Sequence, residues 1–222
     1  MNDERKKWVI ETFHLIFPVV LGIGVVSFVG YVFVNDMQGK YWSFVSAYFF
    51  PPLGKETIIP AGILVGIHPL VMALSIAFVD FIVALFLIWN YDLAKNIPLI
   101  GTFMKKVESI GETSSNKYSW IKPLRFIGIM LFVMIPFQGS GGMVGSIVGR
   151  LIGMKPWTTL ISITLGAVIG CTLVAYFAES LKTILLQNLN AGLIIIASIF
   201  IIGIIIYLYR RNNKKKKQEF IQ

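Results

Sequence analysis

Four ionisable side chains interrupt apolar stretches of this chain. Lys55 and Glu56 are adjacent in the segment PPLGKETIIPAGILVGIHP, residues 51–69, Asp80 lies at the centre of the next apolar run, and Arg150 lies in a second Gly-rich segment. An ionised group at the centre of a bilayer costs about 2.5–3.5 kcal/mol on insertion scales, so such groups mark functional sites in membrane proteins. We therefore take Glu56 and Asp80 as candidates for proton or ion coupling, and Lys55 and Arg150 as candidates for substrate binding.

Each of these residues also has a structural interpretation. Glu56 can be a first-turn carboxylate that a helix N-terminus favours, with Lys55 as its partner. Asp80 can lock the helix bundle through a salt bridge or hydrogen bond, an option that weighs about equally with proton carriage. Arg150 can bind a phosphate, pair with Glu56 or Asp80, or extend its guanidinium to the membrane surface. The sequence leaves these options open.

A glycine-rich turn precedes the expected helical run 143–153 and contains Gln138, Gly139, Ser140, Gly141 and Gly142. The free N–H groups and the positive dipole end of that helix can hold an anion. Alternatively, the glycines only permit a tight turn. The five residues are candidates for substrate binding.

Composition identifies a helical membrane protein. Of the 222 residues, 56% are hydrophobic and only 14% are charged, and the mean hydropathy is +0.76, whereas an ordinary soluble domain carries about 25% charged residues. The net charge of +9 comes mainly from chain ends and one loop, which topology explains without a nucleic-acid partner. One cysteine and two histidines indicate neither a disulfide framework nor a metal site, and we expect no cofactor.

The apolar runs predict an all-α integral membrane protein of one domain, residues 1–222, in the cell membrane. We expect about four transmembrane helices, at residues 8–34, 70–90, 157–178 and 191–209. The interrupted segments between them are too short to cross, and we expect two re-entrant helical hairpins there. Residues 91–123 form a cytoplasmic loop with an amphipathic piece, and residues 210–222 form a basic tail.

The two interrupted segments repeat one pattern. A shift of 87 positions aligns Gly54 with Gly141, Gly62 with Gly149, Gly66 with Gly153 and Pro69 with Pro156. Because glycine and proline mark backbone geometry, these matches indicate an internal repeat with halves at about 44–99 and 124–186. The positions that we expect to shape the hairpins are Pro52, Pro60, Gly62, Gly66, Pro69, Pro136, Gly149, Gly153 and Pro156.

Counting crossings makes this repeat inverted, since the two hairpins then enter from opposite faces. The same count places both termini and the central loop on one face. That face collects Arg5, Lys6, Lys7, Lys95, Lys105, Lys106, Lys117, Lys122, Arg125 and the six basic tail residues, whereas the other carries Lys40 and Lys182. Basic residues favour cytoplasmic loops, so we expect a multi-pass protein with cytoplasmic N- and C-termini.

Residues 55–63, KETIIPAGI, and residues 135–141, IPFQGSG, resemble the small multidrug export protein family. The likeness covers about residues 44–180, and that family more remotely resembles the DedA (VTT-domain) proteins. The resemblance implies two facing re-entrant hairpins and, for DedA relatives, translocation of polyprenyl phosphate or phospholipid head groups with dependence on the proton gradient. It also implies a functional acidic residue in the first hairpin, matched by Glu56, and arginines in the second. Residues 134–142 contain no arginine, and Arg150 comes later.

The predicted function is therefore membrane transport, with a polyprenyl phosphate or membrane lipid as substrate and protons or another cation as coupling ion. A proton-coupled exporter of small cations, with Glu56 and Asp80 as the cation site, is the alternative. An enzyme would need more intramembrane His, Asp or Arg residues than the chain offers, and a non-catalytic scaffold would tolerate Glu56→Gln and Asp80→Asn. The sequence leaves a homodimer open.

Overall fold

The structure is a computed structural model, and it describes residues 3–34, 37–50, 53–91, 121–137 and 140–188, with residues 190, 192, 194, 197, 198 and 201 individually. The predicted fourth span (191–209) falls largely outside these residues. Pro52, Gln138, Gly139, most of the loop 91–123 and the tail 210–222 also lie outside them.

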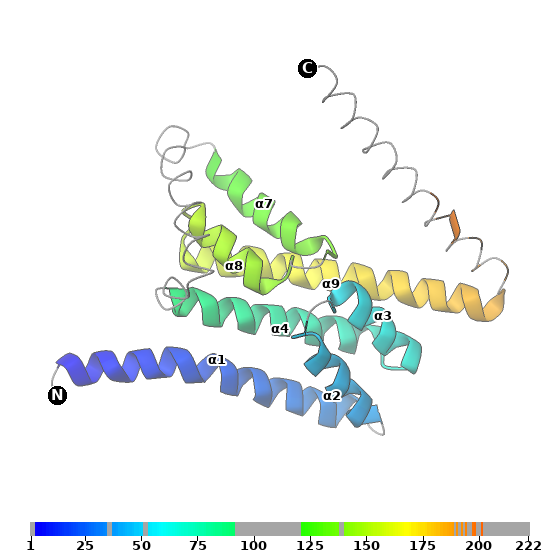
Figure 1. Ribbon diagram of the computed structural model, residues 1–222, viewed down its shortest axis with the longest axis horizontal. Coiled ribbons are helices and arrows are strands. Elements are labelled where there is room, and N and C mark those ends of the chain that lie inside the picture. The colour runs from blue at the N-terminus through cyan, green and yellow to red at the C-terminus, as the bar shows by residue number, and fades with distance from the viewer. Residues whose placement is uncertain are drawn as a thin grey trace, which may run out of the picture. The chain divides into compact units, whose positions relative to one another are not determined.

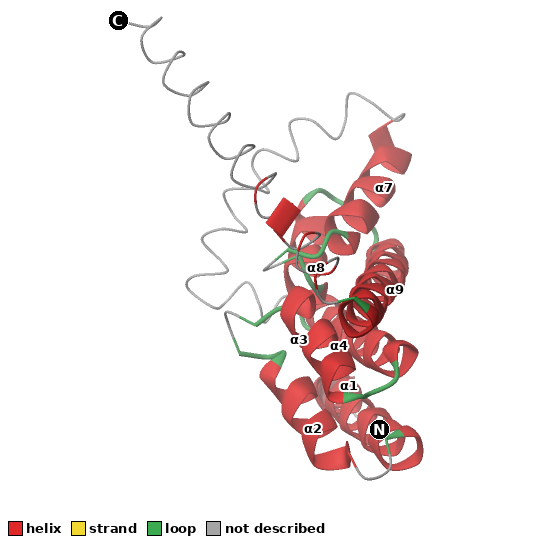
Figure 2. Cartoon of the chain, turned by 90° about the vertical axis from the view of Figure 1, so that its right-hand side faces the viewer, coloured by secondary structure: helices red, strands yellow, loops and turns green. Residues whose placement is uncertain are grey.

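The described residues form α-helices and contain no strand (Figure 2). The helices are α1 (Asp3–Phe33), α2 (Gln38–Ala47), α3 (Lys55–Val65), α4 (Pro69–Trp89), α7 (Ile121–Met134), α8 (Gly142–Leu151) and α9 (Pro156–Gln187) (Figure 1). Within this part of the chain, Trp8–Phe33, Pro69–Trp89 and Pro156–Gln187 are long and apolar enough to cross a membrane. The all-helical prediction and three of the four predicted spans are thus confirmed, and α7 and α8 are short, as expected.

The chain divides into two compact units, Met1–Ala178 and Glu179–Gln222. In the second unit α9 continues to Gln187, nine residues beyond the predicted end at 178. The Thr183 hydroxyl donates to the carbonyl oxygen of Glu179, which is an ordinary bond within the helix. All of the candidate site lies in the first unit.

Helices α2 and α3 form a helical hairpin, here the first hairpin, and α7 and α8 form the second. The first hairpin packs on α4. Tyr41 donates to the Ser75 hydroxyl over 2.8 Å, and Tyr48, one residue past α2, donates to Asp80. From the first contact to the second, the residue number increases on both helices, so α2 runs parallel to α4. The chain then reverses, because Gly62 in α3 lies against Met72 while Lys55 lies near Asp80. Hence α3 runs antiparallel to α4, and its N-terminus points at the middle of that helix.

The second hairpin packs in the same way on α9. Gly149 in α8 lies against Thr159, and a Cβ atom at Gly166 would stand 2.3 Å from the carbonyl oxygen of Met130 in α7. A similar close approach joins Gly170 to Met134. Thus α7 runs parallel to α9, as α2 does to α4.

The α8 helix runs parallel to α4. At its start, Gly142 contacts Asp80, and near its end the guanidinium of Arg150 lies 4.9 Å from the Tyr91 ring centroid. Because α3 runs antiparallel to α4, the two short helices α3 and α8 approach Asp80 from opposite ends of α4. Their N-termini meet at the centre of that helix.

The repeat spacing of 87 residues is visible in the backbone. Gly66 and Gly153 both have positive φ, +110° and +78°, the conformation that glycine adopts without strain. Matching 3.0 Å hydrogen bonds span these two glycines, from the Ile67 N–H to the Gly62 carbonyl and from the Met154 N–H to the Gly149 carbonyl. The α4 and α9 helices then begin at Pro69 and Pro156, where proline's missing N–H costs no bond. The two segments therefore share their local geometry.

Two further prolines of the predicted set have different settings. Pro60 lies inside α3, where it cannot donate to the carbonyl four residues earlier. Pro136 follows the end of α7, so it stands where that helix stops. Helix α3 continues through Pro60 to Val65, so of these two positions Pro136 alone coincides with the end of a helix.

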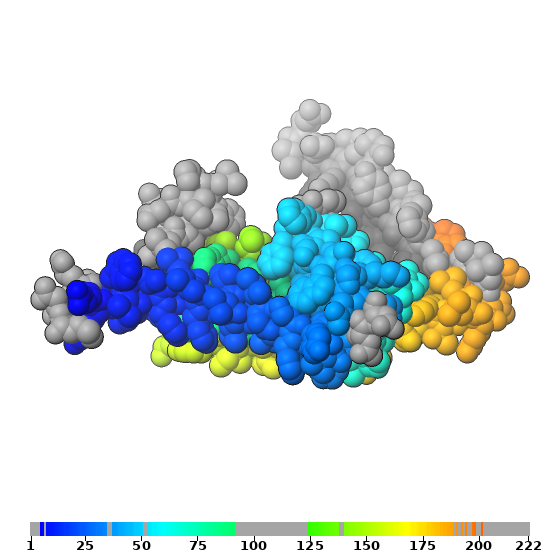
Figure 3. All heavy atoms as spheres, turned by 90° about the horizontal axis from the view of Figure 1, so that it is seen from below, coloured from blue at the N-terminus to red at the C-terminus, as the bar shows by residue number. Residues whose placement is uncertain are grey.

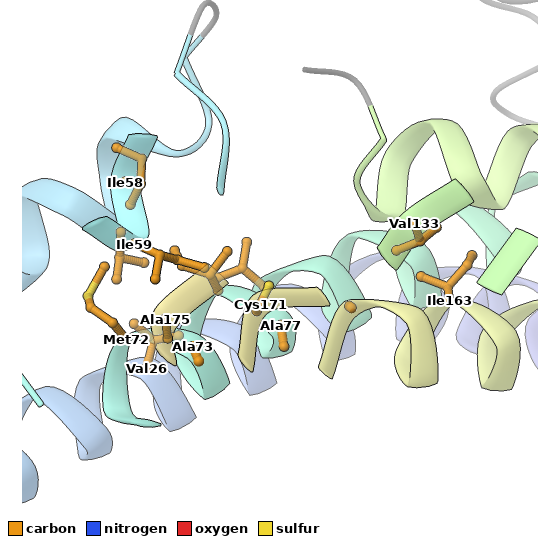
Figure 4. Packing of buried hydrophobic residues seen from close by; sticks show 14 of the residues in the cluster. Val26, Ile58, Ile59, Met72, Ala73, Ala77, Val133, Ile163, Cys171 and Ala175 are labelled. Atoms are coloured by element: carbon orange, nitrogen blue, oxygen red, sulfur yellow. The ribbon is translucent and has the colours of Figure 1, made fainter. Parts of the chain in front are cut away.

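The core of the first unit lies between the hairpins and the long helices. In Figure 4, Ile58 and Ile59 lie above Met72 and Ala73, and Val133 faces Ile163 across the α7–α9 contact. The α1 helix is largely exposed, with Trp8 and Tyr31 among its outward side chains, and it forms a ridge beside α2 in the space-filling view (Figure 3). An exposed apolar helix of this length suits contact with lipid.

Candidate functional site

Asp80 is the centre of the candidate site. It shares a helix face with Ala73, Ile76, Ala77 and Ala84, which are buried at helical spacing. The side chain is itself buried, with 3% of the residue exposed. A carboxylate on the core face of an apolar helix needs donors from neighbouring elements.

Two donors from different hairpins meet one carboxylate oxygen. The Tyr48 hydroxyl and the backbone N–H of Gly142 each donate to Oδ1 of Asp80 over 2.8 Å. The N–H belongs to the first residue of α8, so the positive end of that helix also faces the carboxylate. Asp80 thus joins the first hairpin, α4 and the second hairpin.

The other oxygen of Asp80 faces Lys55. The Lys55 ammonium lies 4.0 Å from Oδ2, which is an ion pair without a hydrogen bond, and Oδ2 is buried with no hydrogen-bond partner. Lys55 begins α3 and is 2% exposed, and its ammonium donates to the carbonyl oxygen of Val133. A buried ion pair of this kind is costly to break, since either partner alone is an uncompensated charge.

A cavity of about 190 Å³ opens between the two helix N-termini. Its walls include Gly54, Lys55, Asp80, Gly141 and Gly142, with Phe49, Leu53, Phe137 and Met143 also lining it. These four apolar side chains are exposed, so they form the rim. At ~30 Å³ per water, the space corresponds to about six molecules, and it is smaller than drug-sized pockets of about 300–1,000 Å³. It suits an ion or a compact head group.

Glycine at the start of α8 makes the close approach to α4 possible. A Cβ atom on Gly142 would stand 2.0 Å from the backbone oxygen of Asp80, and one on Gly141 would stand 2.7 Å from Oδ1. Any side chain at these positions would push α8 away from the carboxylate. The Gly-rich turn therefore positions the N–H group as well as permitting a bend.

The remaining predicted site residues lie around this centre. The Glu56 carboxylate lies against Gly54, next to the cavity and outside its lining. Ser140 is 1% exposed, and its hydroxyl donates to the carbonyl oxygens of Ile135 and Phe137, so it closes the turn. Arg150 donates to the Met154 carbonyl oxygen over 3.0 Å, at the far end of α8 from Asp80.

Two pairings that the sequence left open differ from the structure. The structural interpretation of Glu56 gives it Lys55 as a partner, whereas the Lys55 ammonium faces Asp80, since Lys55 begins α3 beside the middle of α4. Pairing with Glu56 or Asp80 is one of the options that the sequence gives for Arg150, and its guanidinium instead lies over the Tyr91 ring. The length of α8 separates it from the cavity.

Two components of the site were not predicted, Tyr48 and the carbonyl group of Val133. Tyr48 is a single tyrosine in an aromatic stretch, and no spacing rule connects it to a residue 32 positions later. The Val133 carbonyl is a main-chain group without a sequence signature. The end of a short helix before Pro136 was the available signal, since the last carbonyls of a helix have no partner within it.

A second cavity, of about 640 Å³, lies between α1, α2 and α4. Its wall is mostly apolar, and the two hydroxyl groups that it includes, on Tyr41 and Ser75, bond to each other. It lies toward the N-terminal end of α4, beside His68. Its volume falls in the range of drug-sized ligand pockets.

Comparison with protein families gives a match. The model of a family described as "Putative small multi-drug export protein" matches residues 56–173, which include α4, α8, Asp80 and all of α3 except Lys55. Neither the curated proteins nor the solved structures contained a match to the chain.

Proposed function

The chain belongs to the family of putative small multi-drug export proteins, and from this membership we propose that it is a transporter whose substrate crosses at the cavity beside Asp80. The observation that carries the proposal is the meeting of two oppositely directed short helices at a buried carboxylate in the middle of an apolar helix. Transporters bind substrate and coupling ions near the midplane, at the ends of broken helices.

The repeat supports a mechanism of alternating access. We propose that α2–α3 and α7–α8 are re-entrant hairpins related as an inverted repeat, with both chain termini in the cytoplasm. The supporting observations are the shared backbone geometry at the 87-residue spacing and the opposite directions of α3 and α8 along α4. Rocking of one hairpin against the other would open the cavity to either side in turn.

The donors at the cavity favour an anionic group as the transported part. Lys55, the Gly142 N–H and the Tyr48 hydroxyl all face Asp80. A proton on Asp80 would remove the negative charge that these groups now compensate, and they would then bind a phosphate. One proton would thus prepare the site for one anionic head group.

The size and rim of the cavity favour a lipid phosphate over a free drug. A phosphate group is small enough for a space of about 190 Å³, while the chain of a polyprenyl phosphate or phospholipid would stay in the surrounding hydrocarbon. The exposed rings of Phe49 and Phe137 at the rim would contact the chain. Glu56 and Arg150 lie outside the cavity lining. In this mechanism the Glu56 carboxylate compensates the positive N-terminal end of α3 beside it, and the Arg150 guanidinium lies at the membrane surface.

A proton-coupled exporter of small cations is the second candidate. It is favoured by Oδ2 of Asp80, an acceptor without a donor, and by the larger apolar cavity of about 640 Å³. Lys55 opposes it, because a cationic substrate would have to displace the ammonium that faces that oxygen. We therefore rank the anionic head group first.

Head-group translocation of a labelled polyprenyl phosphate in sealed proteoliposomes tests the proposal. We expect the wild-type protein to translocate the lipid. In Asp80→Asn the translocation rate should fall about tenfold or more. Glu56→Gln tests whether the neighbouring carboxylate also takes part. Glu11→Gln, the same change at an exposed site of α1, is the control and should keep the wild-type rate. Wild-type vesicles that pump a small cation and leave the lipid in place would reverse the ranking.

A further inference from the structure

The Lys55 ammonium occupies a site made of oxygen atoms. Its neighbours are Oδ2 of Asp80 at 4.0 Å and the carbonyl oxygen of Val133, which come from two different helices. The lysine is fully enclosed, with 2% of the residue exposed. The ammonium is therefore held by a preformed pair of acceptors inside the protein.

Within the part of the chain that the structure describes, no hydrogen-bond donor other than Lys55 reaches these two acceptors. Oδ1 of Asp80 already accepts from Tyr48 and Gly142, which leaves Oδ2 without a hydrogen-bond donor. Val133 lies in the last turn of α7, where carbonyl groups have no partner within the helix. Carboxylate and carbonyl oxygens are the ligands of hard metal cations. In broken-helix transporters, the C-terminal ends of half-helices coordinate sodium.

We infer that Lys55 is a tethered cation in a site that would otherwise bind a monovalent metal ion. The wild-type protein therefore takes no sodium or potassium between Asp80 and Val133. Removing the amino group, as in Lys55→Ala, exposes both oxygens to the cavity and creates a binding site for such an ion.

This inference deepens the proposed function and rests on it for one consequence, the identity of the coupling ion. With the metal site filled by the protein's own ammonium, the groups around it that can gain or lose a proton are the Asp80 carboxyl, the Lys55 ammonium and the Tyr48 hydroxyl, with Glu56 beside Gly54. Coupling at the cavity would then use protons and would be indifferent to sodium. The binding claim itself does not require transport.

Thermal unfolding of the purified protein in detergent tests the binding claim. Wild type, Lys55→Ala and Lys155→Ala are compared in equal concentrations of sodium, potassium and choline chloride. Lys155 is exposed before α9 and supplies the matched control. Sodium or potassium should raise the melting temperature of Lys55→Ala relative to choline, by roughly 3–6 °C for an ion at ten times its Kd. Wild type and Lys155→Ala should melt at the same temperature in all three salts.

Each result decides the inference. Sodium or potassium stabilisation of wild type would overturn it, and so would a folded Lys55→Ala variant that responds to neither ion. If Lys55→Ala survives solubilisation only when sodium or potassium is present, the inference is supported. The double variant Lys55→Ala/Asp80→Asn should lose any cation response. Lipid translocation is measured separately, so an inactive protein with the predicted cation response would refute the proposed function alone.

Discussion

Adding one methyl group at Gly142 should separate α8 from α4. In Gly142→Ala, the new Cβ would stand 2.0 Å from the backbone oxygen of Asp80, 2.7 Å from its carbonyl carbon and 3.0 Å from its Cα. All three atoms belong to the backbone of a helix interior, which cannot move aside as a flexible side chain can. The start of α8 must shift instead, and the 2.8 Å bond from the Gly142 N–H to Oδ1 is lost.

The expected cost follows from three effects. Overpacking a tight contact costs about 1–3 kcal/mol, and losing a hydrogen bond to a charged group costs about 1.5–3 kcal/mol. Alanine is about 1 kcal/mol better than glycine in a helix, which offsets part of this. The net destabilisation of Gly142→Ala is about 1.5–5 kcal/mol, or roughly 3–20 °C in melting temperature for a chain of this size.

Thermal unfolding in detergent measures this shift, and lipid translocation in vesicles measures its consequence. Gly128→Ala is the control, because a Cβ atom at Gly128 in α7 would meet nothing within 4 Å. It should be as stable as wild type or slightly more so, with full activity. If Gly142→Ala proves as stable and active as Gly128→Ala, α8 does not approach Asp80 as closely as described, and the geometry of the candidate site is refuted.

Two further predictions concern the other partners of Asp80. Tyr48→Phe removes the hydroxyl that donates to Oδ1 of Asp80 and should lower the free energy of unfolding by about 1.5–3 kcal/mol. Tyr41→Phe, which removes a hydrogen bond to the neutral Ser75, should lower it by only about 0.5–1.5 kcal/mol. Denaturation in mixed detergents compares the two variants, and equal losses would contradict a charged Asp80. Asp80→Asn leaves the Lys55 ammonium uncompensated and should cost about 3–5 kcal/mol. The double variant Asp80→Asn/Lys55→Met should recover much of that loss, and strict additivity in this double-mutant cycle would show that the two residues do not interact.

The helix breaks were predictable from sequence because they depend on local geometry. The glycines at 66 and 153 were assigned to hairpin ends from their spacing alone, and both adopt positive φ. The helical run expected at 143–153 is α8, at Gly142–Leu151. Pro69 and Pro156, matched by the same shift, both begin long helices. Glycine widens and proline narrows the range of backbone angles that a residue can adopt. Their positions therefore predict turns and helix ends without knowledge of the tertiary contacts.

The partners within the site were not predictable, because they come from distant parts of the chain. Asp80 was singled out as an intramembrane acid, yet its donors lie 32 and 62 positions away. The alternative that paired Lys55 with its neighbour Glu56 rested on sequence proximity, whereas adjacent residues on a helix point in different directions. Only the docking of α3 on α4 determines whether Lys55 or Glu56 points toward α4. The sequence therefore identified the charged residues and left their pairing to the structure.

The two repeat halves differ at the positions that matter for charge. Asp80 corresponds to Ala167 in the second half, and Lys55 corresponds to Gly142. Each helix N-terminus carries about half a positive charge, so α3 and α8 together with Lys55 bring about two positive charges to the cavity region. Asp80 and Glu56, which lies against the N-cap of α3, compensate them. The resting site is then close to neutral, and one proton on Asp80 would leave about one positive charge for the ligand to balance. A second fixed carboxylate at the cavity would compensate that charge permanently and remove the reason for an anion to bind. In the proposed mechanism, the asymmetry between the halves is therefore what couples one proton to one negative charge of the substrate.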